Sequence, residues 1–211
     1  MIRLILSITA IILTVLLIGC TSYSRMEIVS GPIGIIAEEE RNIIDEEPFD
    51  IGEIAADERF FWDIISSLNI NQTIGYEGFG QRDHDLVIPP LVATLSNLSD
   101  REIFTFHETL SMLLFNIDCR ELAYRSARYA GRNWVSGSSF LFARAAAVAN
   151  GEEHYNQVLN REVLLNDDLW FEPILYAARE AWGLKHGRSM WEFPFFASVS
   201  YETGSNVELW D

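Results

Sequence analysis

The stretch "SDREIFTFHETLSMLLFNIDCRELAYRSARYAG", residues 99–131, decides the fold, because it contains two helix signals in succession. Ser99 and Glu102 form the pattern of a capping box, in which each side chain accepts a hydrogen bond from the backbone N–H of the other residue. The helix that follows carries apolar residues at helical spacing on one face: Ile103, Phe106, Leu110, Leu113, Leu114 and Ile117. This first signal predicts an amphipathic helix with one buried face.

The second signal repeats the first. Asp118 and Glu121 have the spacing of another capping box, and Gly131 is expected to end the helix that they open. Outside this stretch, the helical period predicts further helices at residues 57–68, 89–98, 140–149, 155–159 and 171–182. Asp57 is placed to cap the first of these, and Pro89 with Pro90 to mark the start of the second.

Seven amphipathic helices with short links predict an all-α fold, a compact bundle of about six or seven helices. Pro173 must lie in the first turn of the last helix, because a proline in a helix interior removes a hydrogen bond. The glycines of residues 69–83 indicate a loop. The C-terminal tail, residues 188–211, is rich in aromatics and is expected to be irregular or a short β-hairpin around Thr203-Gly204. It is either an interaction site or, as we favour, a lid on the core.

The N-terminus has the layout of an export signal. Arg3 precedes sixteen uncharged residues, Leu4 to Gly19, and a helix of that length spans about 24 Å, less than the ~30 Å core of a bilayer. Leu17-Ile18-Gly19-Cys20 resembles the lipobox of bacterial lipoproteins, which implies cleavage after Gly19 and lipid on Cys20. The alternative is an uncleaved signal anchor. Because position 21 is not aspartate, we expect an envelope protein that faces the periplasm from the outer membrane, if the cell is Gram-negative.

Charge and punctuation divide the chain. The segment 38–58 contains ten carboxylates and one arginine, and such a density of like charge favours an extended stalk. We therefore expect a cleaved signal peptide at 1–19, an acidic flexible tether at 20–56, a helical domain at 57–187 and the tail at 188–211. With 15 basic and 31 acidic residues, the net charge is −16, which excludes nucleic acid as a natural partner. Lipid on Cys20 leaves Cys119 without a partner, and we expect it to be buried.

Candidate chemistry is sparse. Asp83, His84 and Asp85 are weak candidates for part of a metal site on a loop, but adjacent residues seldom aim at one ion. His107-Glu108 begins like a zincin motif, but its fifth position is Ser111, so a zinc ligand is missing. The run "SGSS", residues 136–139, lacks the spacing of a nucleophile elbow and is expected to cap a helix. We therefore expect no cofactor, no metal and no catalytic residue.

Four arginines are candidates for partner binding. Arg125, Arg128 and Arg132 form a basic stripe at helical spacing, which could hold a carboxylate-bearing partner or pair with local acids. Arg144 shares a helix face with Leu141, so it is expected to be partly buried and to need a partner. In that position it would be structural or would line a pocket.

The stretch "RAAAVANGEEHY", residues 144–155, resembles the pattern Arg-Ala-Trp-Leu-Ile-Ala-Gln-Gly-x-Glu-x-Tyr of a bacterial family filed as domain of unknown function 4240. Further matches lie in order along residues 60–182, among them Phe61-Trp62, Glu102-Ile103 and Glu121-Leu122-Ala123. The chain departs from the pattern at Ser138-Ser139, where the family has two aspartates, and at Ala146, where it has tryptophan. The resemblance implies a helical fold and assigns no activity.

These observations predict a lipid-anchored envelope protein whose helical domain binds a protein or peptide, in a specific version an immunity-type neutraliser of a basic partner. One rival is an envelope hydrolase with His84, Asp85 and Arg144 in a cleft, which requires a solvent-accessible Arg144. The other is a self-assembling structural lipoprotein. The chain is thus more an interaction protein than an enzyme.

Overall fold

The computed structural model describes residues 53–67, 81–165 and 171–211, and side chains within 81–86 are excluded from that description. The chain divides into two units, Met1–Glu47 and Pro48–Asp211, and all the described residues belong to the second. The predicted signal peptide, Cys20 and nearly all of the tether lie outside the described residues. Within the described residues, no helix is both long and apolar enough to cross a bilayer.

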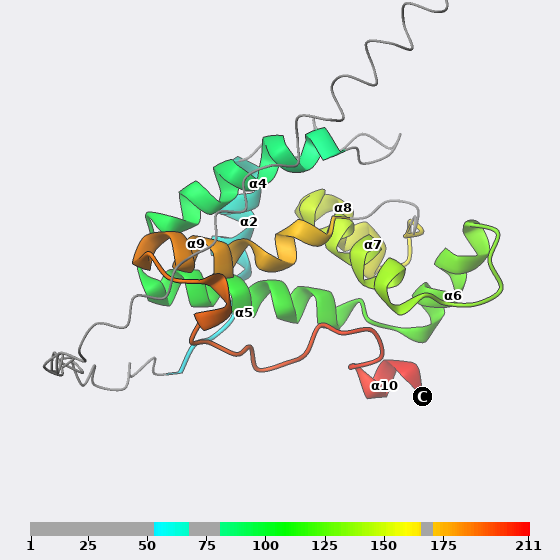
Figure 1. The fold of residues 1–211 in the computed structure, drawn as a ribbon. Coiled ribbons are helices and arrows are strands. Elements are labelled where there is room, and N and C mark those ends of the chain that lie inside the picture. Colours follow the sequence, from blue (N-terminus) through cyan, green and yellow to red (C-terminus); the bar gives the residue numbers. More distant parts are fainter. Residues whose placement is uncertain (1–52, 68–80, 166–170) are drawn as a thin grey trace, which may run out of the picture. The chain divides into compact units, whose positions relative to one another are not determined.

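The described part of the second unit is built from helices alone, as Figure 1 shows. Its elements are α2 (Glu58–Ser67), α4 (Gln81–Ser96), α5 (Asp100–Asn116), α6 (Arg120–Tyr129), α7 (Gly137–Ala149), α8 (Glu152–Leu159), the 3-10 helix η1 (Glu172–Tyr176), α9 (Ala177–His186), the 3-10 helix η2 (Met190–Glu192) and α10 (Val207–Trp210). The predicted all-α fold is confirmed.

Helix α5 is the centre of the bundle. It begins with the predicted capping box, because the Ser99 N–H donates to Glu102 Oε2 at 2.8 Å and the Glu102 N–H donates to Ser99 Oγ at 3.3 Å. All six apolar residues predicted for its face are completely buried. This face and its flanks pack against α2, α4, α7 and α9. Burial of so many large side chains supplies most of the driving force for folding.

A cluster of charges joins the first turn of α5 to the last turn of α9. Lys185 Nζ lies 2.6 Å from Asp100 Oδ1 and also donates to the Leu98 carbonyl oxygen at 2.7 Å, while His186 Nε2 lies 2.9 Å from Asp100 Oδ2. Burial alone would raise the pKa of Asp100, but hydrogen bonds from Lys185 and His186 outweigh it and lower that pKa. An acid at a helix start and two bases at a helix end also match the dipoles of both helices.

Helix α4 contradicts the prediction that Pro89 and Pro90 mark a helix start. The helix begins at Gln81, eight residues earlier, and both prolines lie inside it. Each proline lacks the N–H that would donate to the carbonyl four residues before, so two helical hydrogen bonds are missing. The prolines are exposed, whereas Val87, Ile88, Leu91 and Leu95 are buried. Packing of this apolar face, mainly against α9, outweighs the local cost of the prolines.

The start of α6 also differs from the prediction. Cys119, not Asp118, is the N-cap residue, and its sulfur accepts from the Leu122 N–H at 3.4 Å. The prediction for the other end is confirmed: Ala130 is the C-cap and Gly131 adopts φ +73°. The N–H groups of Gly131 and Arg132 donate back to Arg128 and Ala127, the two bonds of a Schellman motif. The carboxylate of Asp118 is thus left for another use.

Other predicted signals are confirmed. Asp57 Oδ1 accepts from the Phe60 N–H at 3.0 Å at the start of α2, and Ser136 caps α7 through the Ser139 N–H at 3.3 Å. The predicted helix 171–182 begins as a 3-10 turn with Pro173 at its start and continues as α9. The helix predicted to end at residue 149 does so, since α7 ends at Ala149 and Asn150-Gly151 separates it from α8.

The tail, residues 188–211, runs beside α5 in Figure 1 and ends in α10, which contacts α6. It contains η2, extended backbone and a turn in which the Ser205 N–H donates to the Glu202 carbonyl oxygen at 3.1 Å. It forms no β-hairpin, since its polar groups bond to α5 and α7 instead of to a partner strand. Phe193 is buried and Phe195, Tyr201 and Trp210 pack against the core, whereas Trp191 and Phe196 are exposed. The tail is therefore a lid with two aromatic side chains turned outward.

Candidate functional site

Asp118, between α5 and α6, fastens the tail to the bundle. Its side chain is completely buried and accepts hydrogen bonds from four donors of the tail, of which the Ser205 hydroxyl at 3.5 Å is the most distant. The backbone N–H groups of Gly204 and Asn206 donate to Oδ2 at 2.9 Å and 3.1 Å, and Trp210 Nε1 donates to Oδ1 at 3.0 Å. A single carboxylate thus fixes the turn and the final helix of the chain.

Arg144 of α7 supplies the counter-charge. Its guanidinium is completely buried, lies 3.6 Å from Asp118 Oδ1 and 4.8 Å from the centre of the Phe140 ring. It donates to the Leu114 carbonyl oxygen at 2.8 Å, and to the Tyr201 carbonyl oxygen and Thr203 Oγ1 at 3.1 Å each. Burial lowers the pKa of Arg144 to about 10, against the opposing effect of Asp118, so the side chain stays charged at neutral pH.

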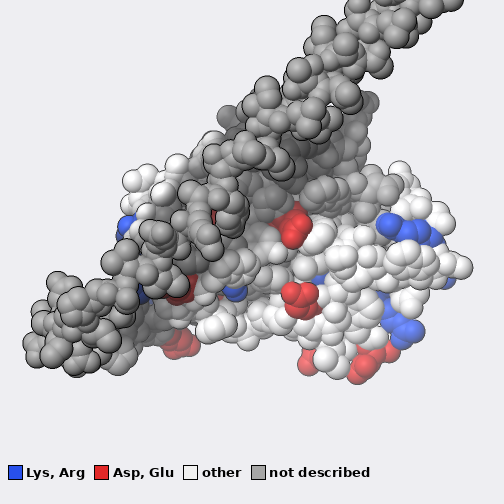
Figure 2. Space-filling view, in the orientation of Figure 1, with Lys and Arg blue, Asp and Glu red and all other residues white. Residues whose placement is uncertain are grey.

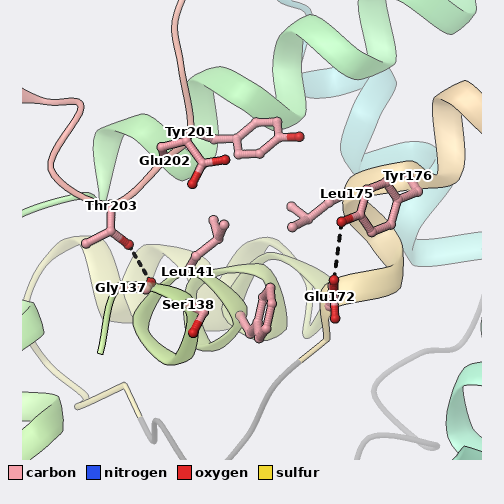
Figure 3. Close-up of a pocket in the computed structure, with 10 residues that line it drawn as sticks. Gly137, Ser138, Leu141, Glu172, Leu175, Tyr176, Tyr201, Glu202 and Thr203 are labelled. Atoms are coloured by element: carbon pink, nitrogen blue, oxygen red, sulfur yellow. Dashed lines mark hydrogen bonds between the residues drawn. The ribbon is translucent and has the colours of Figure 1, made fainter. Parts of the chain in front are cut away.

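The lid borders a pocket of about 360 Å³ between the start of α7, the 3-10 helix η1 and the tail. We call it the acidic pocket. Its lining residues are Gly137, Ser138, Leu141, Phe142, Glu172, Leu175, Tyr176, Tyr201, Glu202 and Thr203. Figure 3 shows Glu202 and Glu172 on two sides of this space, with Leu141 and Leu175 between them. The pocket therefore combines an apolar floor with two carboxylates.

Two hydrogen bonds set its walls. The Tyr176 hydroxyl donates to Glu172 Oε1 at 3.2 Å, and Thr203 Oγ1 donates to the Gly137 carbonyl oxygen at 2.7 Å (Figure 3). Burial and the Glu172 carboxylate both raise the pKa of Tyr176, so its hydroxyl is protonated and acts as a donor. Because Arg144 holds Tyr201 and Thr203, the buried ion pair also positions the tail side of the pocket.

Of the arginines predicted for partner binding, Arg125, Arg128 and Arg132 lie on or just after α6, whereas Arg144 lies in α7. Arg125 Nη1 lies 3.2 Å from Glu121 Oε1, the guanidinium of Arg132 lies over the Trp134 ring, and Arg128 is exposed. On the face drawn in Figure 2, basic side chains gather at the end of the domain where Figure 1 places α6. Arg144 lies elsewhere, without exposed surface, so it does not meet the requirement of an accessible arginine in a cleft.

The prediction that Asp83, His84 and Asp85 lie on a loop is wrong, because all three residues belong to helix α4. Apolar residues later in that helix provide the buried face that extends it across this stretch. The side chains of Asp83, His84 and Asp85 lie outside the described part of the structure. Among the residues that are described, no group of three or more His, Cys, Asp or Glu side chains is placed to hold a metal ion.

The side chains of three further residues are engaged in contacts within the domain. Cys119 is a free thiol and buried, as predicted. Glu108 is buried and accepts from the Ser198 N–H at 2.9 Å and from the Ser198 hydroxyl, which ties another part of the tail to α5. Ser111 donates to the His107 carbonyl oxygen at 2.8 Å. None of these groups opens onto the acidic pocket.

Sequence reasoning missed the residues of the acidic pocket. Glu172 and Tyr176 are four residues apart, a spacing that can indicate a side-chain hydrogen bond on a helix, but it carries no sign of a pocket. Glu202 is thirty residues beyond Glu172 and reaches it only because the tail folds back over α7. No local pattern in the sequence encodes that return.

These features define a class: a helical domain closed by its own C-terminal tail, with an acidic pocket at the edge of the lid. Residues 56–183, more than half of the chain, match the model of a family described as "Protein of unknown function (DUF4240)". The chain belongs to this family. No curated protein and no solved structure matches it.

Family membership gives the acidic pocket a point of comparison. Ser138 lines the pocket and occupies one of the two positions, Ser138 and Ser139, where the resemblance described above implies aspartates. Ser139 is partly buried and accompanies Ser136 at the cap of α7. In this chain the carboxylates of the pocket come instead from η1 and the tail.

Proposed function

We propose that this protein is a lipid-anchored envelope protein whose helical domain binds a basic segment of a protein or peptide. The acidic pocket receives an arginine or lysine side chain of that partner. One observation carries the proposal: Glu172 and Glu202 face a common space that is floored by Leu141 and Leu175. Such a space accommodates the aliphatic stem of a basic side chain together with its charged end.

Charge supports a cationic ligand. Within the described residues, neither Glu172 nor Glu202 has a basic side chain within ion-pair distance. Two carboxylates that make no close ion pair favour an incoming cation, and the rings of Tyr176 and Tyr201 add attractive faces for it. The net charge of −16 further attracts a basic partner over a longer range.

The leader supports the anchor. Leu17-Ile18-Gly19-Cys20 has the lipobox pattern, and Gly19 with Cys20 marks the cleavage point. Lipid on Cys20 would hold the binding domain at the membrane, on the periplasmic side of the outer membrane in a Gram-negative cell. Replacement Cys20→Ser followed by cell fractionation tests this part: the product should become soluble or keep its leader uncleaved. A product that is pelleted with membranes at its original mature size would contradict the anchor.

The binding part is tested with basic peptides. Full-length protein in detergent is titrated with N-acetyl-arginine amide and with short arginine- and lysine-containing peptides, and affinity is measured by calorimetry. The double variant Glu172→Gln/Glu202→Gln should weaken binding by about tenfold or more, because charge-assisted hydrogen bonds are lost. Glu153→Gln, on the exposed side of α8, is the matched control and should bind like the wild type. Equal affinity in the double variant would overturn the proposal.

The two rivals stay predictions with their own tests. A hydrolase built on His84, Asp85 and Arg144 would lose its activity on replacement of Asp85, whereas Arg144 is occupied inside the core. Self-assembly would appear as a mass that rises with protein concentration. The pocket gives neither rival a specific supporting contact.

A further inference from the structure

A second pocket, of about 300 Å³, lies on another part of the lid and has a different character. It is enclosed by α5, α9 and residues 196–202 of the tail. The side chains that matter in it are His107, Arg179, Phe196, Val199, Tyr201 and Glu202. We call it the arginine pocket.

Arg179 is the unusual group of this pocket. Within the described part of the chain, it has no carboxylate within 4.0 Å, and its Nε is buried without a hydrogen-bond acceptor. Its guanidinium lies 5.8 Å from the centre of the Phe193 ring, which is a cation–π contact. An arginine that is partly desolvated and lacks an anion is a ready-made site for one.

His107 adds a second polar group without a partner. Its side chain is 2 % exposed, Nδ1 is buried without a hydrogen bond, and neither ring nitrogen is bonded to any described residue. Aromatic rings of Phe193, Phe195 and Tyr201 contact it edge to face. Buried polar atoms are nearly always satisfied, so unbonded nitrogens on two side chains that line the same pocket point to a ligand.

The protonation states fix the charge that the pocket accepts. Burial, together with the positive charge of Arg179, lowers the pKa of His107 to about 4, so the ring is neutral at pH 7 and has one N–H to donate. Burial raises the pKa of Tyr201, whose hydroxyl makes no hydrogen bond to the described residues and is also a donor. The pocket thus offers the positive charge of Arg179 and two neutral donors, beside the carboxylate of Glu202.

We propose that the arginine pocket binds a carboxylate group, whose oxygens accept hydrogen bonds from Arg179, His107 and Tyr201. A carboxylate fits better than phosphate, because Glu202 lines the same pocket and its repulsion increases with the negative charge of the ligand. Phe196 and Val199 supply an apolar edge for the carbon part of the ligand. The carboxylate belongs either to a small organic acid or to the C-terminal end of a peptide. This inference does not rest on binding of a cation in the acidic pocket.

Calorimetric titration of the full-length protein in detergent tests the proposal. The probes are propionate for a free acid, N-acetyl-alanine and N-acetyl-Ala-Ala for a peptide end, N-acetyl-alanine amide for the uncharged control, and inorganic phosphate. A carboxylate probe should bind, and the amide and phosphate should bind at least about tenfold more weakly, because the amide has no charge to pair with Arg179 and the phosphate dianion is repelled more strongly by Glu202. Tighter binding of propionate indicates a small acid, and tighter binding of N-acetyl-Ala-Ala indicates a peptide end.

Three variants locate the site. Arg179→Gln should reduce the affinity for the carboxylate by about tenfold or more, Tyr201→Phe by a few-fold, and Arg59→Gln, which removes an exposed positive charge on α2, should leave it unchanged. Tyr201→Phe keeps the ring and therefore the packing. Its affinity for the carboxylate still tests the proposal if Arg179→Gln does not fold. Equal binding of acid and amide, preference for phosphate, absence of binding, or wild-type affinity in Tyr201→Phe would each overturn the proposal.

Discussion

Replacement of Asp118 by alanine should release the tail and destabilise the whole domain. The change removes the acceptor of the Gly204 N–H, the Asn206 N–H and Trp210 Nε1, and it leaves the buried guanidinium of Arg144 without its counter-charge. Removal of one partner of a buried ion pair costs about 3–5 kcal/mol. The lost hydrogen bonds do not add to this in full, because the tail donors regain water when the tail is released.

Two measurements follow this change. Urea unfolding of the full-length protein, followed by tryptophan fluorescence, gives the free energy of unfolding, and hydrogen exchange reports the amides of residues 198–211. We expect a loss of about 3–5 kcal/mol and fast exchange at Gly204 and Asn206. Asp63→Ala, at an exposed site on α2, is the control and should change stability by no more than about 0.5 kcal/mol.

A double variant separates charge from hydrogen bonding. Asp118→Ala/Arg144→Met removes the buried charge together with its partner, so it should be more stable than Asp118→Ala alone, while exchange in the tail stays fast. The reasoning is refuted if Asp118→Ala loses less than about 1 kcal/mol, well below the range for a broken buried pair. Retained protection of Gly204 and Asn206 would refute it equally.

Two further predictions concern pH and packing. Because the pKa of His107 falls from 6.5 to about 4 on folding, the unfolded state binds more protons between these values, and stability should fall as pH drops through this window. Between pH 7 and pH 5, the free energy of unfolding of the wild type should fall by about 2 kcal/mol more than that of His107→Gln, as measured by urea unfolding of both proteins. Parallel pH profiles of the two proteins would contradict this. In Gly183→Ala, the new Cβ would lie 2.8 Å from the Arg188 carbonyl oxygen, so we expect a loss of about 1–3 kcal/mol in thermal unfolding, against less than about 0.5 kcal/mol for the exposed control Ser66→Ala.

The sequence predicted the bundle because its helices carry local signals. The capping box of Ser99 and Glu102, the apolar face of α5 and the Gly131 stop each depend on residues a few positions apart, and each is confirmed. The sequence did not predict the start of α4, because Pro89 and Pro90 are a local signal for a helix start. Packing against α9 instead stabilises a helix that begins at Gln81 and contains both prolines.

The candidate sites were not accessible to the same reasoning. Asp118 has the correct spacing to Glu121 for a capping box, but its carboxylate is used by residues 204–210, far away in the sequence. The acidic pocket likewise joins Glu172 to Glu202 through the path of the tail, which local periodicity does not specify. Burial of Cys119 was predictable from residue type alone, whereas its role as the N-cap of α6 was not.

The central claim is that the acidic pocket holds a basic group of a partner in the cell envelope. A photo-crosslinking residue at Ser138, on the rim of that pocket, tests it directly in intact cells, with mass spectrometry of the crosslinked peptide. We predict a crosslink to a segment that contains arginine or lysine, and its loss in the Glu172→Gln/Glu202→Gln background. A crosslink to a segment without basic residues, or one that persists in that background, would contradict the account.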